Sequence, residues 1–287
     1  MFKQKTNFIT LSLIILVMML MSSPDITAAQ SEDTFDHEHF LLTEILSEYV
    51  SNGKVNYRAL KTNQGGLNKY LQELADIDPE DFKNWTRQQQ LAMWINAYNA
   101  YTIRAVLDSY PIEHSWVSDP LGQFPDSSIR QITGVWDIMT WTVMGKQLSL
   151  NKMEHGIMRQ ELIDPRIHYV LVCASIGCPK LENSAFDAAN LEERLDQAGV
   201  NYIYDSNRIR IDKRHKVVGL PQIYKWFKED FDEGTEYKDL LKNQPSDLSG
   251  LLSWVYKYAN EQDRKFLVNG TYQISYLFYD WGLNESR

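Results

Sequence analysis

The side chains best suited to chemistry lie close together in residues 165–181. This stretch holds both cysteines of the chain, Cys173 and Cys178, together with His168 and Ser175. A cysteine thiolate activated by a nearby base is a nucleophile for acyl and amide chemistry. Ser175 is a second nucleophile candidate, although the G-x-S-x-G pattern of a nucleophile elbow is absent.

The local sequence predicts how these side chains are held. Residues 167–173 form a run of branched and aromatic residues, which predicts a buried strand that ends in a tight turn. Side chains of a strand alternate between its faces at about 3.3 Å per residue, which places His168 and Cys173 on opposite faces about 16 Å apart. This geometry excludes a dyad between the two residues. His155 remains as a base for Cys173, and Cys178 remains able to fold back toward His168.

A disulfide is the competing interpretation of the two cysteines. The chain has only these two, and the turn between them contains Gly177, so a Cα separation of about 5.5 Å is readily reached. In an exported protein such a pair is typically oxidised. Closing so small a loop would stabilise the fold by about 2 kcal/mol. We favour a Cys173–Cys178 disulfide, and a free reactive thiol stays open as the alternative.

Glu154 and His155 are further catalytic candidates. Glu154 stands three residues after Asn151, a spacing close to that of a capping box, so helix capping is the simpler interpretation. His155 would lie in the first turn, where the helix dipole disfavours its charged form and favours a neutral base or ligand. A zinc site from His155, His168 and a carboxylate is conceivable, but HExxH and paired CxxC spacings are absent. We therefore predict no metal and no cofactor.

Asn96 and Asn99 lie on the longest predicted helix, residues 87–109, which Pro111 ends. The helix is apolar on nearly every side, so both amides are expected to be buried. A buried amide without partners costs about 1–3 kcal/mol. The two side chains must therefore bond either the backbone of a neighbouring loop, which we favour, or a ligand.

The other predicted elements are short and mixed. A hairpin is predicted at 139–150, strands at 209–211, 217–220 and 272–279, and helices near 40–50, 67–77, 191–204, 221–231 and 248–258. Strands and helices do not alternate regularly, and no Gly-rich phosphate loop is present. We predict an α+β fold, a mostly helical single domain with a small, largely antiparallel sheet.

The N-terminal sequence predicts an exported protein. Residues 1–29 combine two lysines, an apolar run and small residues before a cleavage point, as in a signal peptide. The apolar run, residues 8–21, is shorter than the ~20 residues that span a membrane, although a retained anchor stays open. Residues 30–39, with the cluster Asp-His-Glu-His at 36–39, are expected to be mobile and solvated. The folded domain is expected over residues 40–284, in the periplasm or outside the cell.

The charge of the chain limits its partners. The net charge is −9, and it becomes −10 once the first 29 residues, with two lysines and one aspartate, are removed. Nucleic-acid-binding proteins present clustered Lys and Arg, and this sequence has no such stripe. We expect a small-molecule or peptide ligand, no nucleic acid, and no stable membrane insertion after signal cleavage.

Four motifs resemble one family. They are the WINAYN sequence at 94–99, the segment 150–155 that ends in Met-Glu-His, the CASIGCP sequence at 173–179, and YDWGLN at 279–284. Together, in this order across residues 40–284, they resemble the domain of unknown function 547 family. Bacterial members look like exported single-domain proteins, whereas plant members carry a leucine-zipper segment that this chain lacks. The resemblance implies one domain and supplies no established catalytic residues.

The residues support two hypotheses of function. The first is an enzyme-like site of hydrolase or acyl/amide-transfer type, acting on a peptide, amide or envelope-derived substrate. Its candidate residues are Asn96, Asn99, Glu154, His155, His168 and Ser175, with the cysteine pair. The second is a non-catalytic binding or scaffold module of the envelope, in which the same polar residues only lock loops.

Overall fold

A 23-residue helix, α5 (Arg87–Ser109), is central to the packing of the protein. In the computed structural model, which describes residues 35–286, every residue from 91 to 103 of this helix is buried. The helix begins with a capping box, in which Thr86 and Gln89 each bond the other's backbone N–H through their side chains. The predicted bounds of this helix are confirmed.

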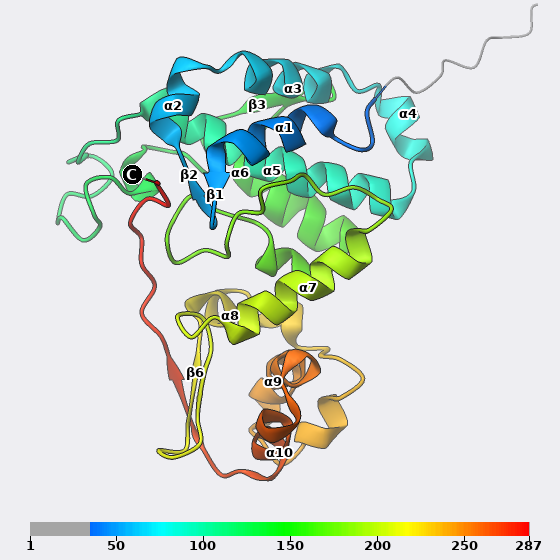
Figure 1. Cartoon of the computed structure of the whole chain (residues 1–287), viewed down its shortest axis with the longest axis vertical. Coiled ribbons are helices and arrows are strands. Elements are labelled where there is room, and N and C mark those ends of the chain that lie inside the picture. Colours follow the sequence, from blue (N-terminus) through cyan, green and yellow to red (C-terminus); the bar gives the residue numbers. More distant parts are fainter. Residues whose placement is uncertain (1–34, 287) are drawn as a thin grey trace, which may run out of the picture. The chain divides into compact units, whose positions relative to one another are not determined.

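The other helices precede or follow α5 in the chain. The α-helices are α1 (Phe40–Tyr49), α2 (Tyr57–Thr62), α3 (Gly65–Asp76), α4 (Pro79–Asn84), α6 (Leu150–Met153), α7 (Leu191–Tyr204), α8 (Gln222–Trp226), α9 (Ser246–Tyr258) and α10 (Glu261–Asn269). Short 3-10 helices are η1 (Ile129–Gln131), η3 (Pro165–Tyr169), η4 (Lys228–Phe231) and η5 (Lys238–Leu241). A π-helix, η2 (Glu154–Leu162), continues α6. Helices α2, α3, α6 and η2 pack against α5, around which Figure 1 shows them arranged.

The strands of the described residues form three small sheets. Two are antiparallel pairs, β1 (Val50–Ser51) with β2 (Lys54–Val55) and β3 (Trp141–Val143) with β4 (Lys146–Leu148). The third sheet has the order β5 (Arg210–Asp212), β6 (Val217–Leu220) and β7 (Gln273–Tyr276), with β6 antiparallel to β5 and parallel to β7. The prediction of an α+β, mostly helical fold with small and largely antiparallel sheets is confirmed. Within residues 35–286, no helix is both long and apolar enough to cross a membrane, and the predicted signal peptide lies outside these residues.

The strand predicted at residues 167–173 is wrong. Asp164 caps η3 by accepting the Arg166 N–H, and Pro165 stands at the first helical position, so the chain turns where we expected it to extend. The residues that follow are buried without being paired to a strand. The Asn99 side chain takes the place of a neighbouring strand, because its amide bonds the Val170 carbonyl and the Val172 N–H at 3.0 and 2.9 Å.

The helix that carries Glu154 also differs from the prediction. Its N-cap is Ser149, whose hydroxyl accepts the Lys152 N–H, and not Asn151. Glu154 therefore does not complete a capping box at the start of the helix; it is the C-cap residue of α6, and His155 lies beyond the first turn. The π-helix begins at Glu154, and such local widening of a helix is frequent at functional sites.

The predicted solvated segment at residues 30–39 is packed against the fold in its described part. His39 is only 2% exposed, and its Nδ1 lies 2.9 Å from the Tyr70 hydroxyl. The Asp36 carboxylate accepts the Phe40 N–H at the start of α1. The sequence did not reveal this packing, because clustered His and acidic residues near a chain end usually lie in solvent.

The C-terminal segment returns from β7 to the start of the fold (Figure 1, red). It pairs with the cysteine turn, which we define as residues 173–178, and then with β2. Ile176 N–H donates to the Gly282 carbonyl at 2.8 Å, and Asn284 N–H donates to the Ala174 carbonyl at 3.0 Å. Val55 then bridges to this segment in parallel. The cysteine turn is therefore held by a segment about one hundred residues further along the chain.

Candidate functional site

A cleft of about 610 Å³ lies at the cysteine turn. Its lining comes from α5, the loop before β3, the α6–η2 segment, η3, α8 and the C-terminal segment. The predicted site residues in this lining are Glu154, His155, His168, Cys173 and Cys178. Side chains from distant parts of the sequence therefore share one concave surface, where enzyme sites are usually found.

The argument by which a pair between His168 and Cys173 was excluded is wrong, because the two residues do not lie on a strand. The sequence placed them on opposite faces of a strand, whereas both line the same cleft. The reason is the turn of the chain in η3 and the irregular backbone after it, which together replace the predicted strand.

Asp230 of η4 joins the two histidines through Arg159. Its carboxylate lies 2.6 Å from His168 Nε2 and accepts two hydrogen bonds from the Arg159 guanidinium, at 2.6 and 2.7 Å. Burial opposes ionisation of Asp230, but the hydrogen bonds and charges of His168 and Arg159 outweigh it and lower the pKa of the carboxyl to about 2. Arg159 also donates to His155 Nδ1 at 2.7 Å.

These contacts decide which ring nitrogens carry protons. A guanidinium only donates, so Nδ1 of His155 accepts and its proton lies on Nε2. An ionised carboxylate only accepts, so Nε2 of His168 carries a proton. Nδ1 of His168 has no hydrogen-bond partner within residues 35–286, and in the neutral ring it keeps a lone pair. His155 can therefore donate a hydrogen bond through Nε2, whereas His168 can act as a base through Nδ1.

Phe227 fixes the planes of both imidazoles. Its ring stacks on His168 with centroids 4.2 Å apart and on His155 at 5.9 Å, and the Arg159 guanidinium lies 5.0 Å from it. Stacking of this kind limits ring rotation and keeps water from one face of each ring. The histidines are therefore held in place by packing as well as by hydrogen bonds.

Glu154 is a buried carboxylate in the same cleft. Tyr98 of α5 also lines the cleft, and burial followed by the negative charge of Glu154 raises the pKa of Tyr98 well above its ordinary value. Tyr98 therefore stays protonated in the presence of this carboxylate. Glu154 thus lies in the cleft, whereas the sequence indicated a role in capping the helix.

The opposite wall of the cleft is aromatic and carries one cation. The Arg130 guanidinium lies 4.5, 5.4 and 5.1 Å from the ring centres of Phe124, Trp136 and Trp281. Within residues 35–286 Arg130 has no acidic partner. A guanidinium held by aromatic rings but not neutralised is suited to bind a carboxylate.

The two asparagines do not face the cleft. Asn96 bonds both backbone groups of Phe186, at 2.7 Å to the carbonyl and 2.9 Å from the N–H, in the way that Asn99 bonds Val170 and Val172. Each amide thus clamps a loop, which is the interpretation that we favoured from the sequence. Ser175 lies in the cysteine turn, where its Oγ is 2.9 Å from the Tyr279 hydroxyl.

The cysteine sulfurs lie at disulfide distance, with 6.2 Å between the Cα atoms, as the sequence predicted. Among residues 35–286, no group of three or more His, Cys, Asp or Glu residues is placed to hold a metal ion. Nδ1 of His155 is bonded to Arg159, and Nε2 of His168 to Asp230.

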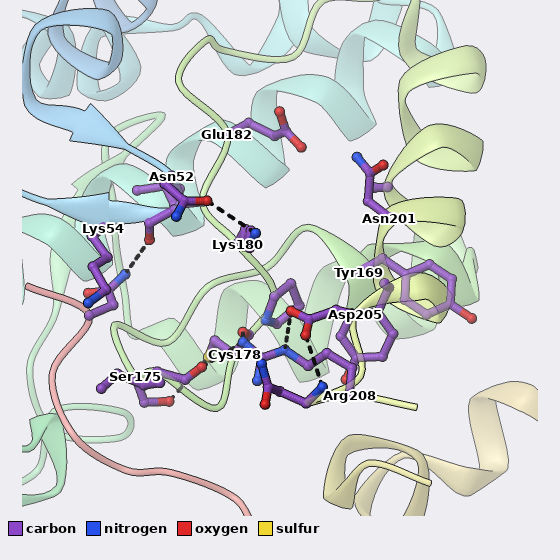
Figure 2. A pocket seen from close by; sticks show the side chains of 18 of the residues that line it. Asn52, Lys54, Tyr169, Ser175, Cys178, Lys180, Glu182, Asn201, Asp205 and Arg208 are labelled. Carbon is purple, nitrogen blue, oxygen red and sulfur yellow. Dashed lines mark hydrogen bonds and ion pairs between the residues drawn. The ribbon is translucent and has the colours of Figure 1, made fainter. Parts of the chain in front are cut away.

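A second cavity, of about 950 Å³, lies on the other side of the cysteine turn. Figure 2 shows its polar lining, with Asn52 bonded to Lys180, and Arg208 and Asp205 beside Cys178. Cys178 lines both cavities, whereas the histidines and Glu154 line only the cleft of 610 Å³. We therefore take the cleft, and not the larger cavity, as the candidate site.

Asp230, Arg159 and Arg130 could not be identified as site residues from the sequence. Asp230 stands in a charged run, Lys-Glu-Asp at 228–230, which is typical of a solvated helix face. Tyr279 did carry a signal, because it opens one of the four family motifs. Asp230, Arg159 and Arg130 are brought to the site only by the tertiary fold.

Replacing Asp230 by asparagine should lower the free energy of unfolding at pH 7 by about 2 kcal/mol, the equivalent of lowering its pKa from 3.8 to about 2. The contribution is present above pH 4 and is lost as the pH falls toward 2. Urea denaturation at pH 7 and pH 2.5 checks this expectation. An equal deficit of the variant at both pH values would contradict it.

Comparison with known proteins gives one match. Residues 82–203 match a family model described as "Protein of unknown function, DUF547", which supports the resemblance to the domain of unknown function 547 family. The match includes α5, the segment with Glu154 and His155, and the cysteine turn, and it ends before the C-terminal motif. No curated protein and no solved structure matches the chain.

Proposed function

We propose that the cleft is the active site of a hydrolase that cleaves the amide bond of a small peptide or N-acyl amino acid. The observation that carries this proposal is that Glu154, His155 and His168, from two separate helical segments, line one cleft in which Asp230 orients His168. An imidazole whose orientation and tautomer are fixed by a carboxylate is a general base. The free cation of Arg130 favours a substrate with a carboxylate.

The proposed reaction consumes one water molecule. Nδ1 of His168 takes a proton from water, and the water oxygen bonds to the amide carbonyl carbon. Nε2–H of His155 donates to the carbonyl oxygen as negative charge develops on it. The C–N bond then breaks, and the imidazolium of His168 returns its proton to the leaving amine. Glu154 accepts the substrate N–H, and Asp230 stabilises the imidazolium.

Replacing His168 by alanine should lower kcat/KM for a series of N-benzoyl amino acids by about 10²–10⁴-fold, the usual contribution of a general base. His155→Gln should lower kcat with little change in KM, because its donor acts on the developing oxyanion. Release of free amino acid is the measurement. His215→Ala, in an exposed turn, is the matched control and should keep full activity.

The variants also separate this proposal from a binding module. If no amino acid is released and the wild-type protein and His168→Ala bind the N-benzoyl amino acids equally, the hydrolase proposal fails and a non-catalytic binding module is favoured. If His168→Ala mainly lowers the melting temperature, His168 is structural and the proposal loses its base. Arg130→Met should raise KM for these acids and leave it unchanged for their methyl amides.

We further infer that the protein is exported as a single-domain member of the family. The apolar run at residues 8–21 and the following small residues support a cleaved signal peptide, and a cysteine pair at disulfide distance is compatible with an oxidising compartment. N-terminal sequencing of the protein recovered from the periplasm or medium tests this. A start near residue 30 is expected, and an intact Met1 would contradict cleavage.

A further inference from the structure

We infer that Cys173 and Cys178 form an exchangeable redox pair that oxidises a small dithiol in the cleft, an activity distinct from amide hydrolysis. The basis is a set of hydrogen-bond donors around the two sulfurs, of which Cys178 has the most. A purely structural disulfide has no need of them, because a disulfide sulfur is a poor acceptor.

Cys178 has one donor more than Cys173. Its Sγ lies 2.9 Å from the Cys173 N–H, 3.1 Å from the Tyr279 hydroxyl and 3.4 Å from the Ser175 hydroxyl. The two hydroxyls also reach Cys173 Sγ, at 3.2 and 3.4 Å, so the backbone N–H is the donor particular to Cys178. The Tyr279 and Ser175 oxygens are 2.9 Å apart, so one hydroxyl can donate to the other while the second donates to the sulfur. Hydrogen bonds gain most when the acceptor is ionised, so this array is suited to a thiolate on Cys178.

The surroundings of the turn support a thiolate at the same atom. The Arg208 guanidinium donates to the carbonyls of Ile176 and Cys178, which places a positive charge beside the turn (Figure 2). Positive charge and backbone N–H groups near a cysteine are the features that stabilise thiolates in reactive sites.

The Tyr279 ring is held closely enough to keep its hydroxyl in place. A Cβ atom added to Gly177 would lie 2.7 Å from this ring, so the ring packs directly on the backbone of the turn. Gly177 N–H also donates to the Asp280 carbonyl at 2.7 Å. The hydroxyl therefore reaches the sulfurs from a fixed position.

The two sulfurs differ in access. Both cysteines line the cleft, but Cys178 is only 2% exposed whereas Cys173 is half-buried. An incoming thiolate therefore meets Cys173 first. The leaving sulfur is then Cys178, which has three donors within reach, and a stabilised leaving thiolate speeds exchange.

The exchange balances without a further reagent. One thiolate of the dithiol attacks Cys173 Sγ, the S–S bond breaks, and its electron pair leaves on Cys178. The second thiol of the substrate, deprotonated by solvent, then attacks the substrate sulfur of the mixed disulfide and releases Cys173 as a thiolate. The dithiol becomes a disulfide by losing two electrons and two protons, and the protein gains two reduced cysteines.

The test uses the oxidised, folded protein and dithiothreitol as the dithiol. Quenched maleimide labelling should show reduction of the native pair at pH 7 at least about tenfold faster than reduction of oxidised glutathione under the same conditions. Tyr279→Phe should slow the reaction about tenfold or more, because it removes a hydrogen bond to a charged sulfur. Tyr276→Phe is the matched control, since this ring of β7 packs against Lys225, and it should leave the rate unchanged.

A second variant and a second readout keep the inference testable if Tyr279→Phe does not fold. Ser175→Ala removes a donor from the same sulfur and should also slow the exchange. The reduced protein should show the 240 nm absorbance of one thiolate at pH 7, and Ser175→Ala should diminish it. A pair that is reduced only after unfolding, or equal rates in Ser175→Ala, Tyr276→Phe and the wild-type protein, would overturn the inference. Amide hydrolysis by the oxidised protein is measured separately, so either activity can fail alone.

Discussion

Replacing Asn99 by alanine should lower the free energy of unfolding by about 2–6 kcal/mol, because two buried backbone groups lose their partners at about 1–3 kcal/mol each. The Val170 carbonyl and the Val172 N–H bond the Asn99 amide at 3.0 and 2.9 Å. No neighbouring strand is available to them, since the described residues of this segment pair with none. Chemical denaturation at pH 7 measures the loss.

Two further variants distinguish the clamp from a loss of packing. Asn99→Asp keeps the acceptor and the volume but turns an oxygen toward the Val170 carbonyl, so it should also destabilise the protein. Asn201→Ala on the exposed part of α7 is the matched control and should change stability by less than about 0.5 kcal/mol. A cost at Asn99 no larger than that at Asn201 would show that the clamp contributes nothing.

Protonation of His39 should destabilise the protein by about 3 kcal/mol as the pH falls from 6.5 to 4. Burial lowers the pKa of this histidine from 6.5 to about 4 in the folded state. The unfolded chain therefore binds more protons in this interval, and the stabilisation is fully present above pH 6.5 and lost as the pH falls through 4. The opposing attraction of Asp36 is smaller than the cost of burial.

Urea denaturation between pH 4 and pH 7.5 checks this expectation. His39→Gln removes the titrating group and keeps an amide that can bond the Tyr70 hydroxyl, so its stability should vary much less across the interval. His215→Gln, at an exposed histidine, should retain the wild-type slope. Identical slopes in His39→Gln and the wild-type protein would contradict the assignment.

The sequence was most informative where one periodic signal continued over many residues. Helix α5 could be placed because its apolar residues continue over many turns and Pro111 ends the pattern. Burial of Asn96 and Asn99 followed from the same pattern, and so did the need for specific partners. The identity of those partners could not follow, because it depends on which loops pack against the helix.

The stretch at residues 167–173 shows why composition was not sufficient. Its branched residues predicted burial correctly and extension incorrectly, because a short apolar run fits a buried strand and a buried irregular segment equally well. Asp164 and Pro165 held the contrary signal, a capped helical turn. The predicted strand was also the basis on which we excluded a dyad of His168 and Cys173.

The residues that complete the cleft could be identified only from the tertiary structure. Asp230 reaches His168 across 62 residues of sequence, and an acidic residue in a charged helical run carries no mark of such a partner. The separate pattern of the cysteines, two in a short turn, was enough to predict their pairing. The sequence thus predicted the pairing of the cysteines in the turn, but it did not identify the groups that surround the turn.

The contact between the cysteine turn and the C-terminal segment also sets an order of events during synthesis. Tyr279 follows Cys178 by 101 residues, which at about 5–20 residues per second corresponds to about 5–20 s on the ribosome. During that interval the nascent cysteines lack the tyrosine hydroxyl and the Gly282 and Asn284 backbone groups that later fix them. The cysteine turn can therefore take its final conformation only after the last residues of the chain have been made.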